Sequence, residues 1–302
     1  MKTLLRLFIL FALGFITATA SAQTTWYLNQ APPYGASWNT SSGGVLIYWS
    51  QNPTSPLGAS PAALSSQDTY DTNKYNLRTP AATLAAPNAT FGGGALILNQ
   101  STLQLKSVIT TIGNLSTAPT WGAISNSDAD VVGESDLILN VTQFTINGEA
   151  RLNSVNSSNR TLALNITTLL GSGNLLFGTS ASTFTFSGIN ATSYTGNMVL
   201  GTGSSLTFSS NPSDWISGGG LILNTGSVVA LNRNLTFTSL TIGGVNVNPG
   251  TYSYAQLNST YDAFFTNTGS GSITVSAIPE PATTGLLIFA GLALMLRRRN
   301  RT

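Results

Sequence analysis

The chain has 302 residues, and charged side chains make up only 7% of them, against roughly 25% in most soluble domains. It contains no cysteine and no histidine, which excludes disulfides, metal sites built from those residues, Ser-His triads and Cys-His dyads. Six of the twelve basic residues lie near the two ends, so the middle holds six basic against nine acidic side chains. Its net charge of about minus three (six minus nine) disfavours nucleic-acid binding.

Residues 1–22 have the three parts of a secretory signal peptide. Lys2 and Arg6 form the positive part, and residues 7–16 form the apolar part. Ala20 and Ala22 supply the small residues of an A-x-A cleavage pattern. We therefore expect an exported protein whose mature chain begins just after Ala22.

Residues 23–90 are distinguished by many aromatic side chains and prolines. The aromatic residues are Trp26, Tyr27, Tyr34, Trp38, Tyr48, Trp49, Tyr70 and Tyr75. Repeat architectures need terminal caps, so we interpret this region as a cap over the first open sheet edge. The alternative is a sugar-binding surface, because residues 68–78 mix aromatic faces with amide, acidic and basic groups.

From residue 91 to residue 277, short β-prone runs alternate with turns rich in Gly, Asn and Ser. Residues 183–186 and 206–208 alternate apolar and polar side chains, which predicts half-buried strands. No sustained apolar stripe of helical period occurs. We predict an all-β fold, namely an irregular right-handed β-helix or β-solenoid, with a β-sandwich as the alternative.

A degenerate Leu-x-Leu-Asn repeat marks four of these runs at uneven spacings. The copies begin at Leu96, Leu137, Leu162 and Leu221. In a solenoid, the Asn of each copy is expected to turn the chain and to hydrogen-bond its counterpart in the next coil. Six leucines are predicted to point into the core: Leu96, Leu98, Leu137, Leu139, Leu221 and Leu223.

Three later segments resemble the passenger-associated repeats of autotransporter-like β-helix proteins. Residues 171–177 carry a G-x-G-x-L entry, residues 194–197 carry a Y-T-G turn, and residues 200–206 follow with two further glycines. The resemblance implies that this part of the body is a β-helix.

The densest acidic group of the body lies between two β-prone runs. It comprises Asp128, Asp130, Glu134 and Asp136. Carboxylate oxygens are the ligands that Ca²⁺ prefers, but the sequence has neither an EF-hand loop nor a glycine-rich calcium repeat. We interpret the group as a solvated acidic turn, with Ca²⁺ binding as the alternative.

Enzymatic chemistry has few candidate residues. A glycoside hydrolase needs two carboxyl groups roughly 5–9 Å apart, for which Asp130 and Glu149 are candidates. The basic residues that could serve a polysaccharide lyase are Lys106, Arg151 and Arg160. Because no motif unites these residues, we expect no enzyme, no catalytic residue, no metal and no cofactor.

The last 25 residues combine three features in a fixed order. Pro279, Glu280 and Pro281 form a stiff extended tripeptide, because each proline locks φ and lacks a backbone donor. Residues 282–296 are apolar, and as a helix they would cover about 22 Å of a roughly 30 Å hydrocarbon core. The arginines that follow, expected on the cytoplasmic side, are Arg297, Arg298, Arg299 and Arg301.

This layout resembles the PEP-CTERM sorting signal, the tail that exosortases recognise in Gram-negative bacteria. The resemblance implies anchoring by a single membrane helix on the periplasmic side of the inner membrane, then tail removal near Pro279, Glu280 and Pro281. It also implies arrival at the cell surface or outside the cell, in association with exopolysaccharide. An ordinary C-terminal membrane anchor is the alternative.

Residues 241–275 resemble the closing unit that often precedes such a tail. Five aromatic residues are predicted to seal the last coil, with a ligand platform as the alternative: Tyr252, Tyr254, Tyr261, Phe264 and Phe265. We therefore expect a signal peptide (1–22), a cap (23–90), a solenoid body (91–277) and a sorting tail (278–302). The predicted function is that of a non-enzymatic structural protein, and the alternative is a carbohydrate-binding or carbohydrate-cleaving β-helix protein.

Overall fold

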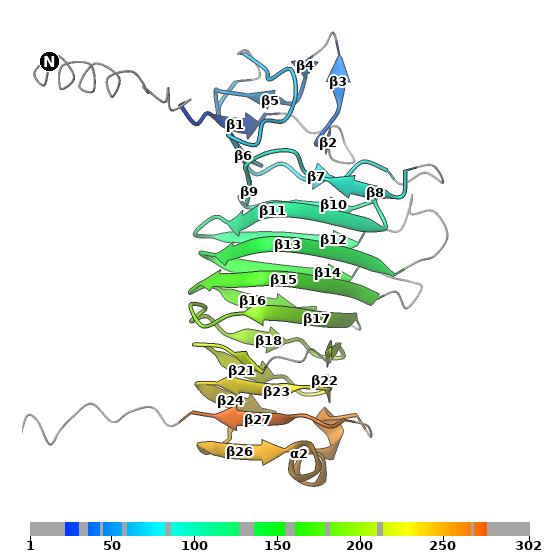
Figure 1. The fold of residues 1–302 in the computed structure, drawn as a ribbon, viewed down its shortest axis with the longest axis vertical. Helices are drawn as coiled ribbons and strands as arrows, with labels where there is room; N and C mark the ends of the chain where they lie inside the picture. The colour runs from blue at the N-terminus through cyan, green and yellow to red at the C-terminus, as the bar shows by residue number, and fades with distance from the viewer. Residues whose placement is uncertain are drawn as a thin grey trace, which may run out of the picture.

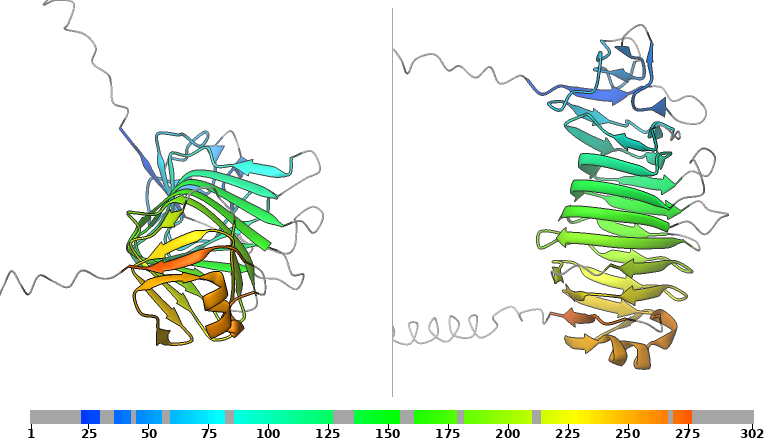
Figure 2. Two further views of the ribbon diagram at one scale, coloured as in Figure 1. Left: turned by 60° about the horizontal axis from the view of Figure 1, so that its bottom comes forward. Right: turned by 45° about the vertical axis from the view of Figure 1, so that its right-hand side comes forward.

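A computed structural model of the chain describes residues 22–29, 36–42, 45–55, 59–81, 86–126, 136–154, 161–178, 182–209, 214–266 and 269–276. Strand makes up 55% of it and helix 5%, and the strands wind into a β-solenoid of about five turns. Figures 1 and 2 show the strands stacked along one long axis, with a short helix at the C-terminal end of the stack. The all-β solenoid prediction is confirmed.

The larger sheet runs along most of the body and contains eleven strands. In spatial order they are β22 (Val228–Leu231), β19 (Ser205–Phe208), β17 (Thr183–Asn190), β15 (Thr161–Gly171), β13 (Leu137–Ile146), β11 (Ile109–Thr117), β9 (Ala95–Leu98), β6 (Thr69–Asp71), β1 (Thr25–Leu28) and β5 (Trp49–Ser50), with β8 (Asn88–Thr90) paired to β11. Neighbouring strands from β1 to β22 are parallel, as successive coils of a solenoid require.

The second sheet lies behind the first in Figure 1 and contains ten strands. In spatial order they are β2 (Ala36–Ser37), β7 (Leu77–Arg78), β10 (Thr102–Leu105), β12 (Trp121–Asn126), β14 (Glu149–Ser154), β16 (Asn174–Phe177), β18 (Met198–Leu200), β21 (Gly220–Leu223), β24 (Ser239–Ile242) and β25 (Val245–Asn246). Only the β24–β25 pair is antiparallel. The β-sandwich alternative is wrong, because β-sandwiches pack two antiparallel sheets.

Each central coil has three sides. β8 pairs with the first part of β11, at residues 109–111, whereas β9 pairs with its last part, at residues 115–117. Between these parts the alternation of inward side chains shifts, since Gly113 and Asn114 both face solvent. β11, β13 and β15 therefore each supply two sides of a coil, and the second sheet supplies the third.

The solenoid interior is filled by alternate side chains from all sides. The six leucines predicted to point inward are all 0% exposed, which confirms that prediction. Near the C-terminal end the filling becomes aromatic: Trp215 packs against Phe186 and Phe237 with ring centroids 5.7 and 5.3 Å apart. Such tilted contacts are the favourable geometry for aromatic pairs.

The Leu-x-Leu-Asn copies mark single strands rather than whole coils. Leu137 and Leu162 lie in register on β13 and β15. Leu96 instead lies in register with Leu115, on another side of the coil, and Leu221 belongs to the second sheet. The uneven spacing of the copies follows, because they occupy different sides of the coil.

One corner of the solenoid is built from glycines in consecutive coils: Gly148, Gly173, Gly196 and Gly219. A Cβ atom on Gly173 would lie 1.6 Å from the carbonyl oxygen of Gly148, and one on Gly196 would lie 1.9 Å from that of Gly173. Only residues without a side chain allow the coils to approach this closely.

A ladder of side-chain to backbone hydrogen bonds runs beside these glycines. Asn174 Oδ1 accepts the backbone N–H of Asn197 at 3.1 Å, and Asn197 Oδ1 accepts that of Gly220 at 3.1 Å. The buried Tyr194 hydroxyl accepts from the N–H of Leu175 at 3.1 Å and donates to the carbonyl of Asn197 at 2.9 Å. Burial raises the pKa of Tyr194, so the phenol stays protonated and keeps its donor.

At the N-terminal end, β1 pairs in parallel with β6 and in antiparallel with β5, which closes the edge of the larger sheet. A two-stranded hairpin of β3 (Ser41–Ser42) and β4 (Val45–Leu46) lies beside it. Trp26, Trp38, Trp49 and Tyr70 are buried there. Four of the eight aromatic residues named for the cap are thus buried at this end, and the 23–90 bounds of the cap stay a prediction. β6, β7 and β8 join this region to the body by pairing with its strands.

A second cap closes the C-terminal end. A four-stranded sheet of β20 (Trp215–Ile216), β23 (Asn234–Phe237), β27 (Ser272–Val275) and β26 (Gly250–Ser253) leads into α2 (Tyr254–Thr260) and η1 (Asp262–Phe264). The Ser253 and Gln256 side chains cap α2 reciprocally. Phe265 is buried, and the other four predicted sealing aromatics, Tyr252, Tyr254, Tyr261 and Phe264, pack partly buried against the core. The sealing role is confirmed.

Candidate functional site

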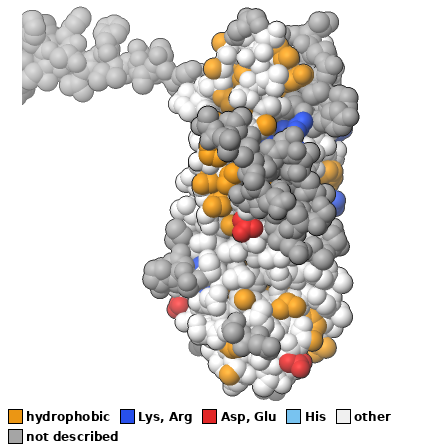
Figure 3. All heavy atoms as spheres, turned by 90° about the vertical axis from the view of Figure 1, so that its right-hand side faces the viewer, with side chains coloured by type: hydrophobic (Ala, Val, Ile, Leu, Met, Phe, Trp, Pro, Cys, Tyr) orange, Lys and Arg blue, Asp and Glu red, His pale blue; other side chains and the backbone are white. Residues whose placement is uncertain are grey.

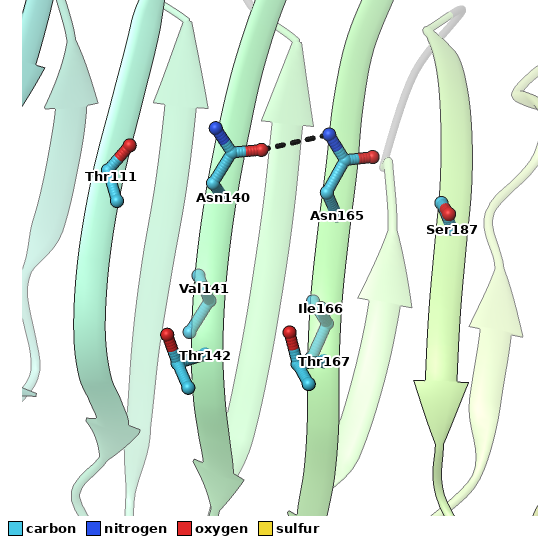
Figure 4. Close-up of a pocket in the computed structure, with 8 residues that line it drawn as sticks. All are labelled: Thr111, Asn140, Val141, Thr142, Asn165, Ile166, Thr167 and Ser187. Carbon is cyan, nitrogen blue, oxygen red and sulfur yellow. Dashed lines mark hydrogen bonds between the residues drawn. The ribbon is translucent and has the colours of Figure 1, made fainter.

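A shallow groove of about 170 Å³ lies on the outer face of the larger sheet, across four consecutive coils. Figure 4 shows the side chains that line it: Thr111, Asn140, Val141, Thr142, Asn165, Ile166, Thr167 and Ser187. They come from β11, β13, β15 and β17, which are far apart in the sequence but adjacent in the sheet. The solenoid register brings them together.

Two features determine which side chains line the groove: the alternation of inward and outward residues along each strand, and the shift of that alternation in the middle of the coil. Thr111, Asn140, Asn165 and Ser187 lie in one register row and face outward. The next residues in β13 and β15, Val141 and Ile166, turn inward and are 2% and 1% exposed. Thr142 and Thr167 then face solvent again and form a shorter second row.

The two amides of the groove hydrogen-bond each other across the coils. Asn165 Nδ2 donates to Asn140 Oδ1 at 2.9 Å. The predicted contact between Asn residues of successive copies is thus found, but these two residues lie inside strands, so for them the prediction that Asn turns the chain is wrong. In the other two copies Asn99 and Asn224 directly follow β9 and β21, as predicted. The asparagines whose side chains hydrogen-bond from coil to coil at a corner are instead Asn174 and Asn197. The sequence signal for them is the recurring Gly-Asn pair, at 173–174 and at 196–197.

The described residues that line the groove all have neutral side chains. Hydroxyls and amides donate and accept hydrogen bonds, but at neutral pH they do not act as general acids or bases. Figure 3 shows another face of the molecule, on which few of the described side chains are charged. The hydroxyls and amides of the groove are therefore suited to binding a neutral polar ligand.

The candidate catalytic groups lie elsewhere. Glu149 and Arg151 project from β14 and form an ion pair with each other. The Arg151 guanidinium also lies 5.1 Å from the centroid of the Trp121 ring. Lys106 is 2% exposed and lies at the end of β10. Asp130 and Arg160 fall outside the described residues, so the Asp130–Glu149 pairing remains a prediction.

The acidic cluster is described only at Asp136, whose side chain is exposed and accepts the backbone N–H of Thr161 at 2.8 Å. Asp128, Asp130 and Glu134 lie outside the described residues. Within the described part of the chain, no group of three side chains of the metal-binding types comes together. The solvated acidic turn and its alternative, a Ca²⁺ site, both stay predictions.

The predicted sugar-binding segment at residues 68–78 is engaged in the cap at Asp68, Tyr70 and Asp71, whereas Lys74, Tyr75 and Asn76 are exposed. The Tyr70 hydroxyl accepts the N–H of Ser65 at 2.9 Å, and its ring is 0% exposed. Asp68 accepts the indole N–H of Trp26 at 2.9 Å, and Asp71 accepts the N–H of Asn73 at 2.7 Å. Burial raises the pKa of Asp71, an effect that its hydrogen bonds partly offset.

Most of the predicted sorting residues lie outside the described residues: Ala20, Pro279, Glu280, Pro281, Arg297, Arg298 and Arg299. Ala22 is described and exposed, three residues ahead of β1. In the described ranges, no helix has both the length and the apolar character of a membrane span.

Comparison of the chain with protein-family models, with curated proteins and with solved structures gave no match.

Proposed function

We propose that this chain is an exported, non-enzymatic structural protein of the cell surface or extracellular matrix. Residues 1–22 direct export, and the tail at 278–302 anchors the chain in the inner membrane until an exosortase cleaves near Pro279, Glu280 and Pro281. The observation that carries the proposal is a solenoid body closed by a cap at each end, between the predicted signal peptide and the predicted sorting tail.

The architecture is suited to such a role. In a solenoid each coil contacts only its neighbours, so the body resists unfolding through many similar local contacts. Here aliphatic and aromatic stacking holds the coils together without disulfides. A surface of hydroxyl and amide groups mixes readily with hydrated polysaccharide, which is the partner that the tail resemblance implies.

Carbohydrate binding is the second candidate function, and the neutral groove across β11, β13, β15 and β17 favours it. The two candidates are compatible, because a matrix protein is retained by what it binds. Carbohydrate cleavage is a different claim, since it requires a carboxyl group that turns over substrate.

The enzymatic alternative is tested on residues 23–277, which contain both caps. The protein is incubated with neutral and acidic polysaccharides, and the release of reducing ends is measured. We expect none above the level given by heat-unfolded protein. Turnover that Glu149→Gln abolishes, while the matched exposed carboxylate substitution Asp262→Asn leaves it intact, would replace the structural proposal with an enzymatic one.

A further inference from the structure

The groove on the larger sheet contains a contiguous set of polar groups that the fold does not use. Among the described residues, no group hydrogen-bonds to the hydroxyls of Thr142 and Thr167, and the same holds for Thr111 and Ser187. The Asn140–Asn165 bond uses one oxygen and one nitrogen, which leaves Asn140 Nδ2 as a donor and Asn165 Oδ1 as an acceptor.

Amides beyond the groove are engaged differently. Asn114 donates to the carbonyl of Gly94 at 2.8 Å, and Asn147 donates to that of Thr117 at 2.9 Å. The asparagines of the corner accept backbone N–H groups of the next coil. These amides satisfy the backbone of their own solenoid, whereas the groove presents its remaining donors and acceptors outward.

The chemistry of the lining selects a class of ligand. None of the described lining residues is charged, so none of them compensates the desolvation of a phosphate, a sulfate or a uronate. These described residues also include no aromatic and no exposed large aliphatic side chain, which peptide grooves use as pockets for anchor residues. A ligand with many hydroxyls and no charge matches the alternating donors and acceptors.

We propose that this groove binds a neutral polysaccharide chain lying across the strands, parallel to the solenoid axis. The row from Thr111 to Ser187 crosses three strand spacings, or about 14 Å, which accommodates a short run of sugar units. Thr142 and Thr167 lie beside the same run and contact its second edge. This inference rests on the proposed function, because export is what brings the groove into contact with extracellular polymer.

The test removes the two hydroxyls of the shorter row while keeping shape and strand propensity. The variant is Thr142→Val with Thr167→Val, and the matched control is Thr185→Val with Thr207→Val. The control threonines lie in register on β17 and β19 and are outward-facing in the same sheet, outside the groove. Circular dichroism melts of all proteins show whether the fold is retained.

Binding of residues 23–277 is measured by affinity electrophoresis in gels containing dextran, hydroxyethyl cellulose or galactomannan, with polygalacturonate as the acidic probe. We expect retardation by at least one neutral polymer and none by polygalacturonate. The groove variant should bind that polymer about tenfold more weakly, since it loses two hydrogen bonds, and the control should bind like the parent protein.

Several outcomes would overturn the proposal. These are an absence of retardation by all three neutral polymers, retardation by polygalacturonate alone, or a groove variant that binds as tightly as the control. A concentration-dependent dimer that the groove variant abolishes would assign the groove to a second copy of the chain instead. If the groove fails these binding tests but the exosortase processes the tail normally, the proposed function stands. If the groove binds a neutral polysaccharide but the tail is not processed, the proposal for the groove stands.

Discussion

The glycine corner gives the sharpest test of how the coils stack. Replacing Gly173 by alanine puts a Cβ atom 1.6 Å from the carbonyl oxygen of Gly148 and 2.8 Å from the side chain of Ile146. Ordinary contact begins at 3.4 Å, so the coils must separate locally by about 1.8 Å (3.4 minus 1.6). Such a shift breaks the 2.9 Å hydrogen bond from the N–H of Gly173 to the carbonyl of Ile146.

The expected cost has two parts. Overpacking in a well-packed region costs about 1–3 kcal/mol, and a buried backbone pair that loses its hydrogen bond adds about 1–3 kcal/mol. We therefore expect Gly173→Ala to lower the free energy of unfolding by about 2–6 kcal/mol. Gly113→Ala is the matched control, because a Cβ atom there meets nothing within 4 Å, and it should be neutral or slightly stabilising.

The assay is equilibrium urea unfolding of residues 23–277, followed by tryptophan fluorescence and analysed by linear extrapolation. An unchanged m value with a lower midpoint for Gly173→Ala would match the expectation. If Gly173→Ala and Gly113→Ala differ by less than about 1 kcal/mol, the coils do not stack as closely as the structure shows and the reasoning fails.

Three further substitutions test the packing of the core, the hydrogen bonds beside the glycine corner and the raised pKa of Asp71. Leu223→Ala should lower the unfolding free energy by about 2–5 kcal/mol, and a value near zero would mean that Leu223 does not face the core. Tyr194→Phe removes the hydroxyl that bonds the N–H of Leu175 and the carbonyl of Asn197, but that N–H keeps the Asn197 carbonyl at 2.8 Å, so the cost in the same assay should be about 0.5–1.5 kcal/mol, and no measurable cost would contradict the role of the hydroxyl. Because burial raises the pKa of Asp71, the stability that its protonated form supplies is full below the unfolded value of 3.8 and falls as pH rises through the folded value. Asp71→Asn should therefore flatten the fall in unfolding free energy that sets in as pH rises above 3.8, and an unchanged pH profile would refute this.

The sequence predicted the fold class because strand alternation leaves a direct signal. Leu96, Leu98 and Leu223 were assigned inward from their period-two pattern, and all three are fully buried. The aromatic residues of both ends were likewise assigned as caps, since a solenoid must close its terminal coils. These predictions depended on local pattern, which does not require knowledge of the coil register.

Register itself could not be predicted from the repeat. The Leu-x-Leu-Asn pattern describes a strand with two inward leucines, and such a strand fits any side of a coil. The groove depends on register, because Asn140, Asn165 and Ser187 become neighbours only when the lengths of the intervening turns are known. The shift at Thr142 and Thr167 could not be predicted either, since the period-two pattern describes one side of a coil and not the point where a strand passes from one side to the next.

Processing of the tail tests the central claim most directly. The full-length chain is expressed in a host with an exosortase and in one without it, and its mass and membrane association are measured. The account predicts that the chain is shortened near Pro279, Glu280 and Pro281 and released only in the exosortase host. The triple variant Pro279→Ala, Glu280→Ala, Pro281→Ala should stay membrane-associated at full tail length in both hosts. Release and shortening of this variant in the exosortase host would contradict the account and identify the segment as an ordinary anchor.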